Sequence, residues 1–257
     1  CPAGGHLAQT RFLDELYHLP RYFFYWTIRQ KFLEVAAEWK PDLLMPGDDT
    51  ACAFLQNLRL QMPDGEHPRI SALIEQSLGT PAHYRSCSDK AMFGSLCARL
   101  GLRFPEQYRS GNTQEVVANG ARLGYPVVFK KSLSCGGVGV EICGNEDELR
   151  RHATGFFGSG PMPLVKRLWW EVHMAKGGDV RHLMRPQEDT IVVQEFIGGR
   201  VCSHTFVAWK GEYLSGFTYE NLNSAEASKN PCRKLRVLDV RYDCEEVARK
   251  LAGELQL

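Results

Sequence analysis

A glycine-rich segment between two short apolar runs constrains the fold of this chain more than any other feature. Residues 126–131, Pro-Val-Val-Phe-Lys-Lys, and residues 138–143, Val-Gly-Val-Glu-Ile-Cys, are rich in strand-forming side chains, and residues 132–137 join them. Two such runs joined by a glycine-containing loop predict an antiparallel hairpin. Glycines also let a loop bring its backbone N–H groups close to a phosphate. The segment therefore predicts either a phosphate-covering hairpin or an ordinary structural turn.

Lys130, at the end of the first run, favours the phosphate-binding alternative. An ammonium at that place can neutralise phosphates that the loop covers, whereas the other interpretation is a solvated lysine at a strand end. The loop is not a Walker A loop, because no Lys-Ser/Thr pair follows it and the next predicted element is a strand. It is not the dinucleotide-binding fingerprint for the same topological reason.

The first fifty residues predict part of an α/β layer. Apolar side chains recur at helical spacing between Ile28 and Trp39. Residues 43–45 then predict a short buried strand that ends in a polar loop, and the aromatic run 22–26 predicts a core strand. A helix, a tight turn, a strand and a polar loop in this order are typical of a doubly wound sheet.

Capping residues and β-type runs predict the remaining elements. Ser88 is predicted to cap a helix that ends at Gly101, and the spacing of a capping box recurs at 112–115 and 145–148. The other predicted elements are a strand at 191–197, a hairpin formed by 204–209 and 213–219, a strand at 234–240 and a helix that begins at Asp243.

Composition excludes several classes of protein. The 257 residues contain 31 Lys and Arg against 30 Asp and Glu, which gives no support to a nucleic-acid partner. No apolar run approaches the roughly 20 residues that span a bilayer, so no membrane partner is predicted. The nine cysteines are scattered without a CxxC pair, which predicts neither a zinc site nor a disulfide scaffold. Reduced thiols of this kind are typical of a cytoplasmic protein.

The order of these motifs resembles the ATP-grasp superfamily. The order is Ser88-Asp89-Lys90 at a helix start, the strand ending at Lys130, the glycine loop 136–140, and Val-Gln-Glu-Phe-Ile-Gly-Gly at 193–199. The resemblance covers roughly residues 80–257 and implies a mixed α/β and α+β fold. A partial Rossmann-like domain is expected at 1–85 and an ATP-grasp module at 86–257. Within the module, a lid subdomain is expected at about 105–193 and an incomplete C-terminal subdomain at 194–257.

The resemblance implies a binding site for the phosphates of ATP. Lys90 and Lys130 match the two lysines that contact phosphate in the family. Gly136, Gly137 and Gly139 match the loop that closes over the phosphates. The same resemblance implies Mg²⁺ as a second cofactor, with its metal ligands expected beyond Leu257.

The resemblance also implies residues for the adenine ring. Gln194 and Glu195 fall at the hinge whose polar groups meet the adenine amino group. Phe196 and Ile197 would offer backbone groups to the ring.

Two further sets of residues follow from the same resemblance. The basic stretch with Arg233, Lys234 and Arg236 matches the place where family members often hold the γ-phosphate or an acyl-phosphate, and Arg233 and Arg236 are the candidate catalytic residues. An acidic ribose ligand of the family is not found at its usual place, which leaves ribose binding to Ser203 or His204.

The implied activity is ATP-dependent ligation of a carboxylate through an acyl-phosphate, with ATP and the carboxylate as partners. Residues are expected to precede Cys1, and the family's metal-binding strands are expected after Leu257. Residues 1–257 are therefore expected not to turn over ATP, and an open sheet edge would favour a homo-oligomer. Two alternatives are a non-catalytic nucleotide-binding fragment and a nucleotide-sugar glycosyltransferase built on Gly4-Gly5-His6.

Overall fold

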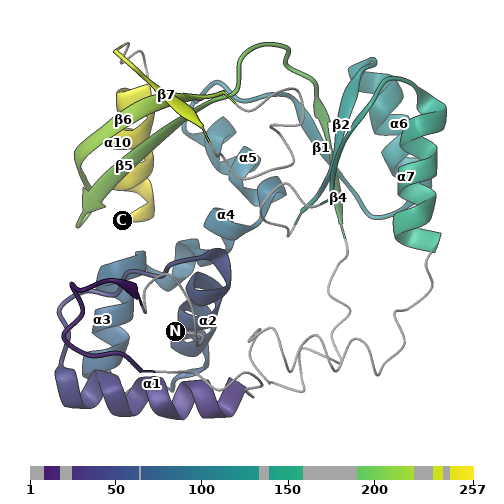
Figure 1. Ribbon diagram of the computed structural model, residues 1–257. Coiled ribbons are helices and arrows are strands. Elements are labelled where there is room, and N and C mark those ends of the chain that lie inside the picture. The colour runs from purple at the N-terminus through teal and green to yellow at the C-terminus, as the bar shows by residue number, and fades with distance from the viewer. Residues whose placement is uncertain are drawn as a thin grey trace. The chain divides into compact units, whose positions relative to one another are not determined.

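The computed structural model describes residues 9–17, 25–63, 65–132, 139–158, 190–222, 234–239 and 244–257. The described residues fall into two compact units, one ending at Ser77 and the other beginning at Leu78 (Figure 1). Gly4-Gly5-His6, Gly136, Gly137 and Arg233 lie outside the described residues.

The first unit contains three helices, α1 (Tyr25–Trp39), α2 (Asp49–Gln61) and α3 (Pro68–Leu78). The helix predicted from the spacing between residues 28 and 39 is confirmed as α1. Asp48 caps α2 by accepting a hydrogen bond from the Ala51 backbone N–H at 2.7 Å. Buried Leu58 of α2 and Ile74 of α3 are both fully shielded from solvent and belong to the core of this unit.

Among the described residues of the first unit, neither of the two predicted strands is present. Residues 43–45 form no strand, because the Leu44 N–H donates to the Ser77 hydroxyl at 3.0 Å rather than to a neighbouring strand, and Met45 is 86% exposed. In the aromatic run 22–26, the described residues Tyr25 and Trp26 belong to α1, and Trp26 is 62% exposed.

The second unit contains a four-stranded antiparallel sheet in the order β1-β4-β2-β3. Its strands are β1 (Gln107–Ser110), β2 (Val127–Lys131), β3 (Val140–Cys143) and β4 (Ile191–Glu195). The pairing of β2 with β3 confirms the predicted hairpin, whose ends are joined by a hydrogen bond from the Lys131 N–H to the Gly139 carbonyl at 3.1 Å.

Helices α6 (Thr113–Leu123) and α7 (Glu146–Gly158) cover one face of this sheet (Figure 1). Both begin with the capping residues predicted from the sequence, Asn112 and Asn145, whose side chains accept from the backbone at 2.9 and 3.0 Å. Alternate strand residues point toward the helices and form the core between the two layers together with helix residues. The strand residues are Val127, Phe129, Cys143, Ile191 and Val193, and the helix residues are Val116, Leu149 and Ala153. The remaining strand residues must therefore face the other side of the sheet.

On that other side, helix α5 (Lys90–Arg99) packs against the edge strand β1, where Gly94 meets the Gln107 side chain. Helix α5 follows the short helices η2 (Pro81–His83) and α4 (Tyr84–Ser88). The predicted cap, Ser88, is wrong by one residue, because Asp89 accepts from the N–H groups of Ala91 and Met92. Ser88 instead ends α4, and its hydroxyl donates to the Tyr84 carbonyl at 3.1 Å.

A second antiparallel sheet consists of β5 (Cys202–Trp209), β6 (Glu212–Asn221) and β7 (Leu235–Leu238). It confirms the predicted hairpin around Lys210-Gly211, and the predicted C-terminal helix is α10 (Cys244–Leu255). Helix α10 packs on this sheet through buried Ala248, Ala252 and Leu255. None of the described helices is both long and apolar enough to cross a bilayer.

Candidate functional site

The strand register gathers several of the predicted site residues on the face of the first sheet that α5 contacts through β1, called the α5 face below. Gln194 lies opposite Gln107 on one side and opposite Val128 on the other. Lys130 lies opposite Val140 and Val192. Directly opposed residues share a face, so the α5 face consists of Gln107, Arg109, Val128, Lys130, Val140, Ile142, Val192 and Gln194.

Lys130 of the α5 face is influenced by the charge of Lys90, the first residue of α5. Lys130 is half-buried, and burial, followed by the charge of Lys90, lowers the pKa of its ammonium below the ordinary value. Among the described residues, Lys130 forms no ion pair with a carboxylate. The ammonium of Lys130 therefore carries a positive charge that an anion would stabilise.

The N-terminus of α5 is held against the end of β2. The Lys90 N–H donates to the Ser132 carbonyl at 3.1 Å, and the Ser132 hydroxyl donates to the carboxylate of Asp89. Asp89 is only 2% exposed, and it also caps α5. These contacts explain why Lys90, which is distant in sequence, lies beside Lys130 and the start of the glycine loop.

Side-chain amides connect the two lysines. The Lys130 ammonium donates to Oε1 of Gln194, and Nε2 of Gln194 donates to Oε1 of Gln107 at 3.1 Å. Nε2 of Gln107 then donates to the backbone carbonyl of Lys90 at 3.1 Å. Gln107 was not predicted as a site residue, although it completes this network.

Gly139 ends the glycine loop in a conformation that favours glycine, with φ of +74°. A Cβ at Gly139 would lie 2.6 Å from Cδ of Lys131, so a side chain there would displace the lysine. Lys131 itself points away from the α5 face, and its ammonium lies 5.3 Å from the centre of the Phe156 ring.

The predicted hinge continues from β4. The Glu195 N–H donates to the Glu106 carbonyl at 2.8 Å, and the Glu195 carboxylate accepts from the Glu106 N–H at 3.2 Å. Because Glu195 is opposite Val127, its carboxylate lies on the face opposite that of Gln194. Phe196 and Ile197 follow with 38% and 60% of their surface exposed.

The described part of the basic stretch lies on the second sheet. Arg236 of β7 is paired with Glu220 of β6, whose carboxylate lies 3.7 Å from the Arg236 guanidinium and 3.5 Å from that of Arg200. Glu220 is 8% exposed, so its charge is compensated by two arginines whose side chains are mostly exposed. Lys234 precedes β7 and is exposed.

The two ribose candidates differ in their surroundings. Ser203 is exposed on β5. His204 faces the other side, where Nδ1 lies 2.9 Å from the Thr218 hydroxyl and the ring stacks on Phe206 and Tyr213. Arg249 of α10 covers the same tyrosine ring, which places His204 on the α10 side of this sheet.

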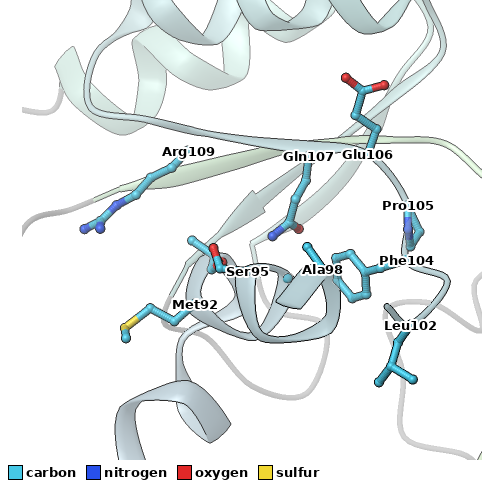
Figure 2. A pocket seen from close by; sticks show the side chains of 11 residues that line it. Met92, Ser95, Ala98, Leu102, Phe104, Pro105, Glu106, Gln107 and Arg109 are labelled. Atoms are coloured by element: carbon cyan, nitrogen blue, oxygen red, sulfur yellow. The ribbon is translucent and has the colours of Figure 1, made fainter. Parts of the chain in front are cut away.

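A pocket of about 380 Å³ lies between α5 and β1 (Figure 2). Figure 2 shows the Gln107 side chain pointing from the strand toward Ser95 and Ala98 on the helix. Gln107 therefore borders both this pocket and the lysine network. The pocket is lined by Ala91, Met92, Gly94, Ser95, Ala98, Leu102, Phe104, Pro105, Glu106, Gln107 and Arg109.

The described residues contain no cluster of three or more His, Cys, Asp or Glu side chains that could hold a metal ion. The residues that the α5 face brings together are cationic and amide-bearing, and suit an anionic ligand better than a cation.

Comparison with known families and structures identifies the fold. Residues 89–161, which include both lysines, match the family described as carbamoyl-phosphate synthase L chain, ATP binding domain. The chain has the ATP-grasp fold. The resemblance inferred from the motif order is therefore confirmed, as is the mixed α/β and α+β fold class.

Three solved ATP-grasp proteins illustrate the similarity. The biotin carboxylase domain of 2-oxoglutarate carboxylase from Hydrogenobacter thermophilus, in complex with MgADP, ADP and bicarbonate, is 17% identical with a TM-score of 0.57. Biotin carboxylase from Campylobacter jejuni, in an ATP complex, is 16% identical with a TM-score of 0.57, and L-amino acid ligase from Bacillus licheniformis is 16% identical with a TM-score of 0.53. The alignments cover 95%, 88% and 88% of this chain and 49%, 46% and 47% of those proteins. The chain thus spans about half the length of the proteins that it resembles.

Proposed function

We propose that the α5 face of this ATP-grasp domain binds ATP, with Lys90 and Lys130 contacting the phosphates. The observation that carries the proposal is the placement of Lys90 at the end of β2, where its N–H donates to the Ser132 carbonyl at 3.1 Å, two residues after Lys130. In agreement with that placement, the charge of Lys90 contributes to lowering the pKa of Lys130. Two ammonium groups that repel each other in the free protein are both stabilised when a polyphosphate lies between them. Binding of ATP should therefore raise the pKa of Lys130 again.

The apolar residues of the α5 face suit the adenine ring. Val128, Val140 and Ile142 lie on adjacent strands of the same face as Lys130, and Ile142 is 50% exposed. A purine can pack on such a surface while the backbone of Phe196 and Ile197 supplies a donor and an acceptor to its edge. The face thus offers an apolar part for the base beside a cationic part for the phosphates. The loop with Gly136, Gly137 and Gly139 would add backbone N–H groups to the phosphates.

For the whole protein we propose ATP-dependent ligation of a carboxylate. A carboxylate oxygen attacks the γ-phosphorus, the bond from that phosphorus to the bridging oxygen breaks, and ADP leaves as an acyl-phosphate forms. A nucleophile such as an amine then attacks the acyl carbon, releases phosphate and loses its proton. The two lysines would stabilise the charge on the phosphate oxygens during the first step. Arg233 and Arg236 are proposed to contact the γ-phosphate or acyl-phosphate.

The similar proteins support the class of reaction. Their names include a biotin carboxylase with bound MgADP and bicarbonate and an amino acid ligase. Magnesium, when bound, would neutralise negative charge on the phosphates in such a reaction. The described residues supply no cluster of ligands for it, and we assign magnesium no step.

The proposal is tested by comparing ATP with adenosine in calorimetric titrations of Lys130→Met and Lys90→Met. Loss of one charged hydrogen bond to phosphate should weaken ATP binding by roughly 10- to 150-fold. Adenosine, which has no phosphate, should bind each variant within about twofold of the original chain. Lys131→Met is the matched control, because Lys131 is the next residue of the same strand but points to the opposite face. Equal losses for ATP and adenosine, or an equal loss in the control, would refute the assignment.

A further inference from the structure

Gln107 connects the two lysines although it contacts neither ammonium. Its Oε1 accepts from Gln194 and its Nε2 donates to the Lys90 carbonyl, both at 3.1 Å. Gln194 is 5% exposed, so its amide depends on protein partners rather than water. Gln107 supplies one of those partners from strand β1, directly opposite Gln194.

The donor and the acceptor of each hydrogen bond in this network follow from the Lys130 ammonium at one end and the Lys90 backbone carbonyl at the other. A lysine ammonium only donates, so the group of Gln194 that faces Lys130 must be the carbonyl oxygen. The NH₂ group of Gln194 then points away and needs an acceptor, which is Oε1 of Gln107. The NH₂ group of Gln107 in turn needs an acceptor, and the Lys90 backbone carbonyl provides it. A fixed carbonyl in the first turn of α5 thus determines the orientation of both amides and of the Lys130 ammonium.

Gly94 makes room for this arrangement. It lies one turn after Lys90 on α5, and a Cβ at this position would lie 2.0 Å from Nε2 of Gln107 and 2.7 Å from its Cδ. Only a glycine lets the helix approach the amide so closely. The position of Gln107 is therefore defined by packing as well as by its two hydrogen bonds.

We propose that Gln107 is a positioning residue for ATP binding, which acts through Gln194 to hold the Lys130 ammonium toward the phosphates. The inference rests on the proposed function of Lys130. A neutral amide suits the role, because it orients the ammonium without cancelling the charge that phosphate needs. Without Gln107, the buried amide of Gln194 loses its acceptor and becomes free to turn its NH₂ group toward Lys130, which cannot accept a hydrogen bond.

The experiment measures ATP and adenosine affinities for Gln107→Met, Lys130→Met and the double variant. Loss of one oriented neutral hydrogen bond should weaken ATP binding by about fivefold and leave adenosine within about twofold. In the Lys130→Met background, Gln107→Met should change ATP affinity by less than about twofold, because the ammonium that Gln107 is proposed to position is absent. Gln114→Met is the matched control, since Gln114 is exposed on α6 and should leave every affinity unchanged.

A spectroscopic readout separates positioning from a general loss of structure. The ¹³Cε resonance of Lys130, assigned by its disappearance in Lys130→Met, should move in Gln107→Met and stay in place in Gln114→Met. If Gln107→Met does not fold, Gln107→Asn replaces it, because the shorter amide cannot reach both partners and should give the same selective loss.

The outcomes distinguish the two proposals. If Lys130→Met leaves ATP affinity unchanged, the phosphate site is refuted and the inference falls with it. If Lys130→Met weakens ATP but the Gln107 variant does not, or weakens it equally in both backgrounds, only the positioning role is refuted.

Discussion

Replacing Gly94 with alanine should destabilise the second unit, although alanine in place of glycine ordinarily stabilises a helix. The substitution adds one methyl group in the interior of α5. Carbon and nitrogen atoms in ordinary contact lie about 3.5 Å apart. The new Cβ would lie 2.0 Å from Nε2 of Gln107 and 3.0 Å from Cε1 of Phe104. Either the helix or the amide must therefore move by about 1.5 Å, the shortfall from ordinary contact.

Three contributions set the magnitude. Overpacking of this kind costs about 1–3 kcal/mol. Displacing the Gln107 amide also weakens its hydrogen bonds to Gln194 and Lys90, at about 1 kcal/mol for each bond lost. The higher helix propensity of alanine returns about 1 kcal/mol. With one of the two hydrogen bonds lost, we expect a net loss of about 2 kcal/mol.

Cys97 provides a local assay, since it lies on α5 and is only 3% exposed. Its thiol reacts with an alkylating reagent when α5 opens, and peptide mass spectrometry resolves it from the other cysteines. A loss of about 2 kcal/mol corresponds to labelling roughly 30-fold faster. Gly155→Ala in α7 is the control, because its Cβ would meet nothing within 4 Å, and the Cys97 rate should not change. An unchanged or slower rate in Gly94→Ala would refute the reasoning.

Three further predictions follow from buried groups. Asp89→Ala should lower the free energy of unfolding by about 2 kcal/mol, whereas Asn112→Ala should lower it by roughly 1 kcal/mol. The difference is expected because Asp89 is a buried cap that also binds Ser132. Equal losses for the two variants in denaturant titrations would contradict this. Burial raises the pKa of Cys143 to about 11, so its thiol should label far more slowly at pH 8 than that of exposed Cys87. Burial and the charge of Lys90 lower the pKa of Lys130 below the ordinary value of a lysine. The contribution of this group to stability should therefore rise as pH increases through the folded-state pKa, while ATP affinity falls over the same range. Lys130→Met should remove both pH dependences, and a persistent affinity change would exclude Lys130 as their source.

Features of the fold that depend only on residues close together in the sequence could be predicted from it. The hairpins around Gly139 and Gly211 and the caps at Asn112 and Asn145 are local, and the structure confirms them. The predicted strand at residues 43–45 is wrong, because a run of three apolar residues does not indicate whether another strand is available to pair with it. The amide of Leu44 finds a side-chain hydroxyl 33 residues away instead of a strand.

The choice between two adjacent capping residues likewise depended on a distant partner. Ser88 and Asp89 are both good caps by residue type. Asp89 is the cap in the structure, and it also binds the hydroxyl of Ser132, which is 43 residues away in the sequence. A local pattern locates a helix start to within a residue, and tertiary contacts decide which residue takes the role.

Gln107 could not be predicted from motif order, because its role depends on the register of β1 with β4. That register joins Gln107 to Gln194 across 87 residues of sequence. One local signal was present in Gly94, since a glycine inside a helix costs about 1 kcal/mol and indicates a close approach by another group. The signal shows where a group approaches but not which group it is.

The chemistry of Gln194 explains why an amide rather than a carboxylate lies beside Lys130. A carboxylate would form an ion pair with the ammonium and compete with phosphate for it. An amide oxygen accepts one hydrogen bond and leaves the positive charge uncompensated, at the cost of a lowered pKa for Lys130. In the free protein, the charged form of Lys130 is therefore less stable than in an ordinary lysine, and a bound anion would stabilise it again. The neutral amide beside Lys130 and the absence of an ion pair to Lys130 among the described residues thus both favour an anionic ligand on the α5 face.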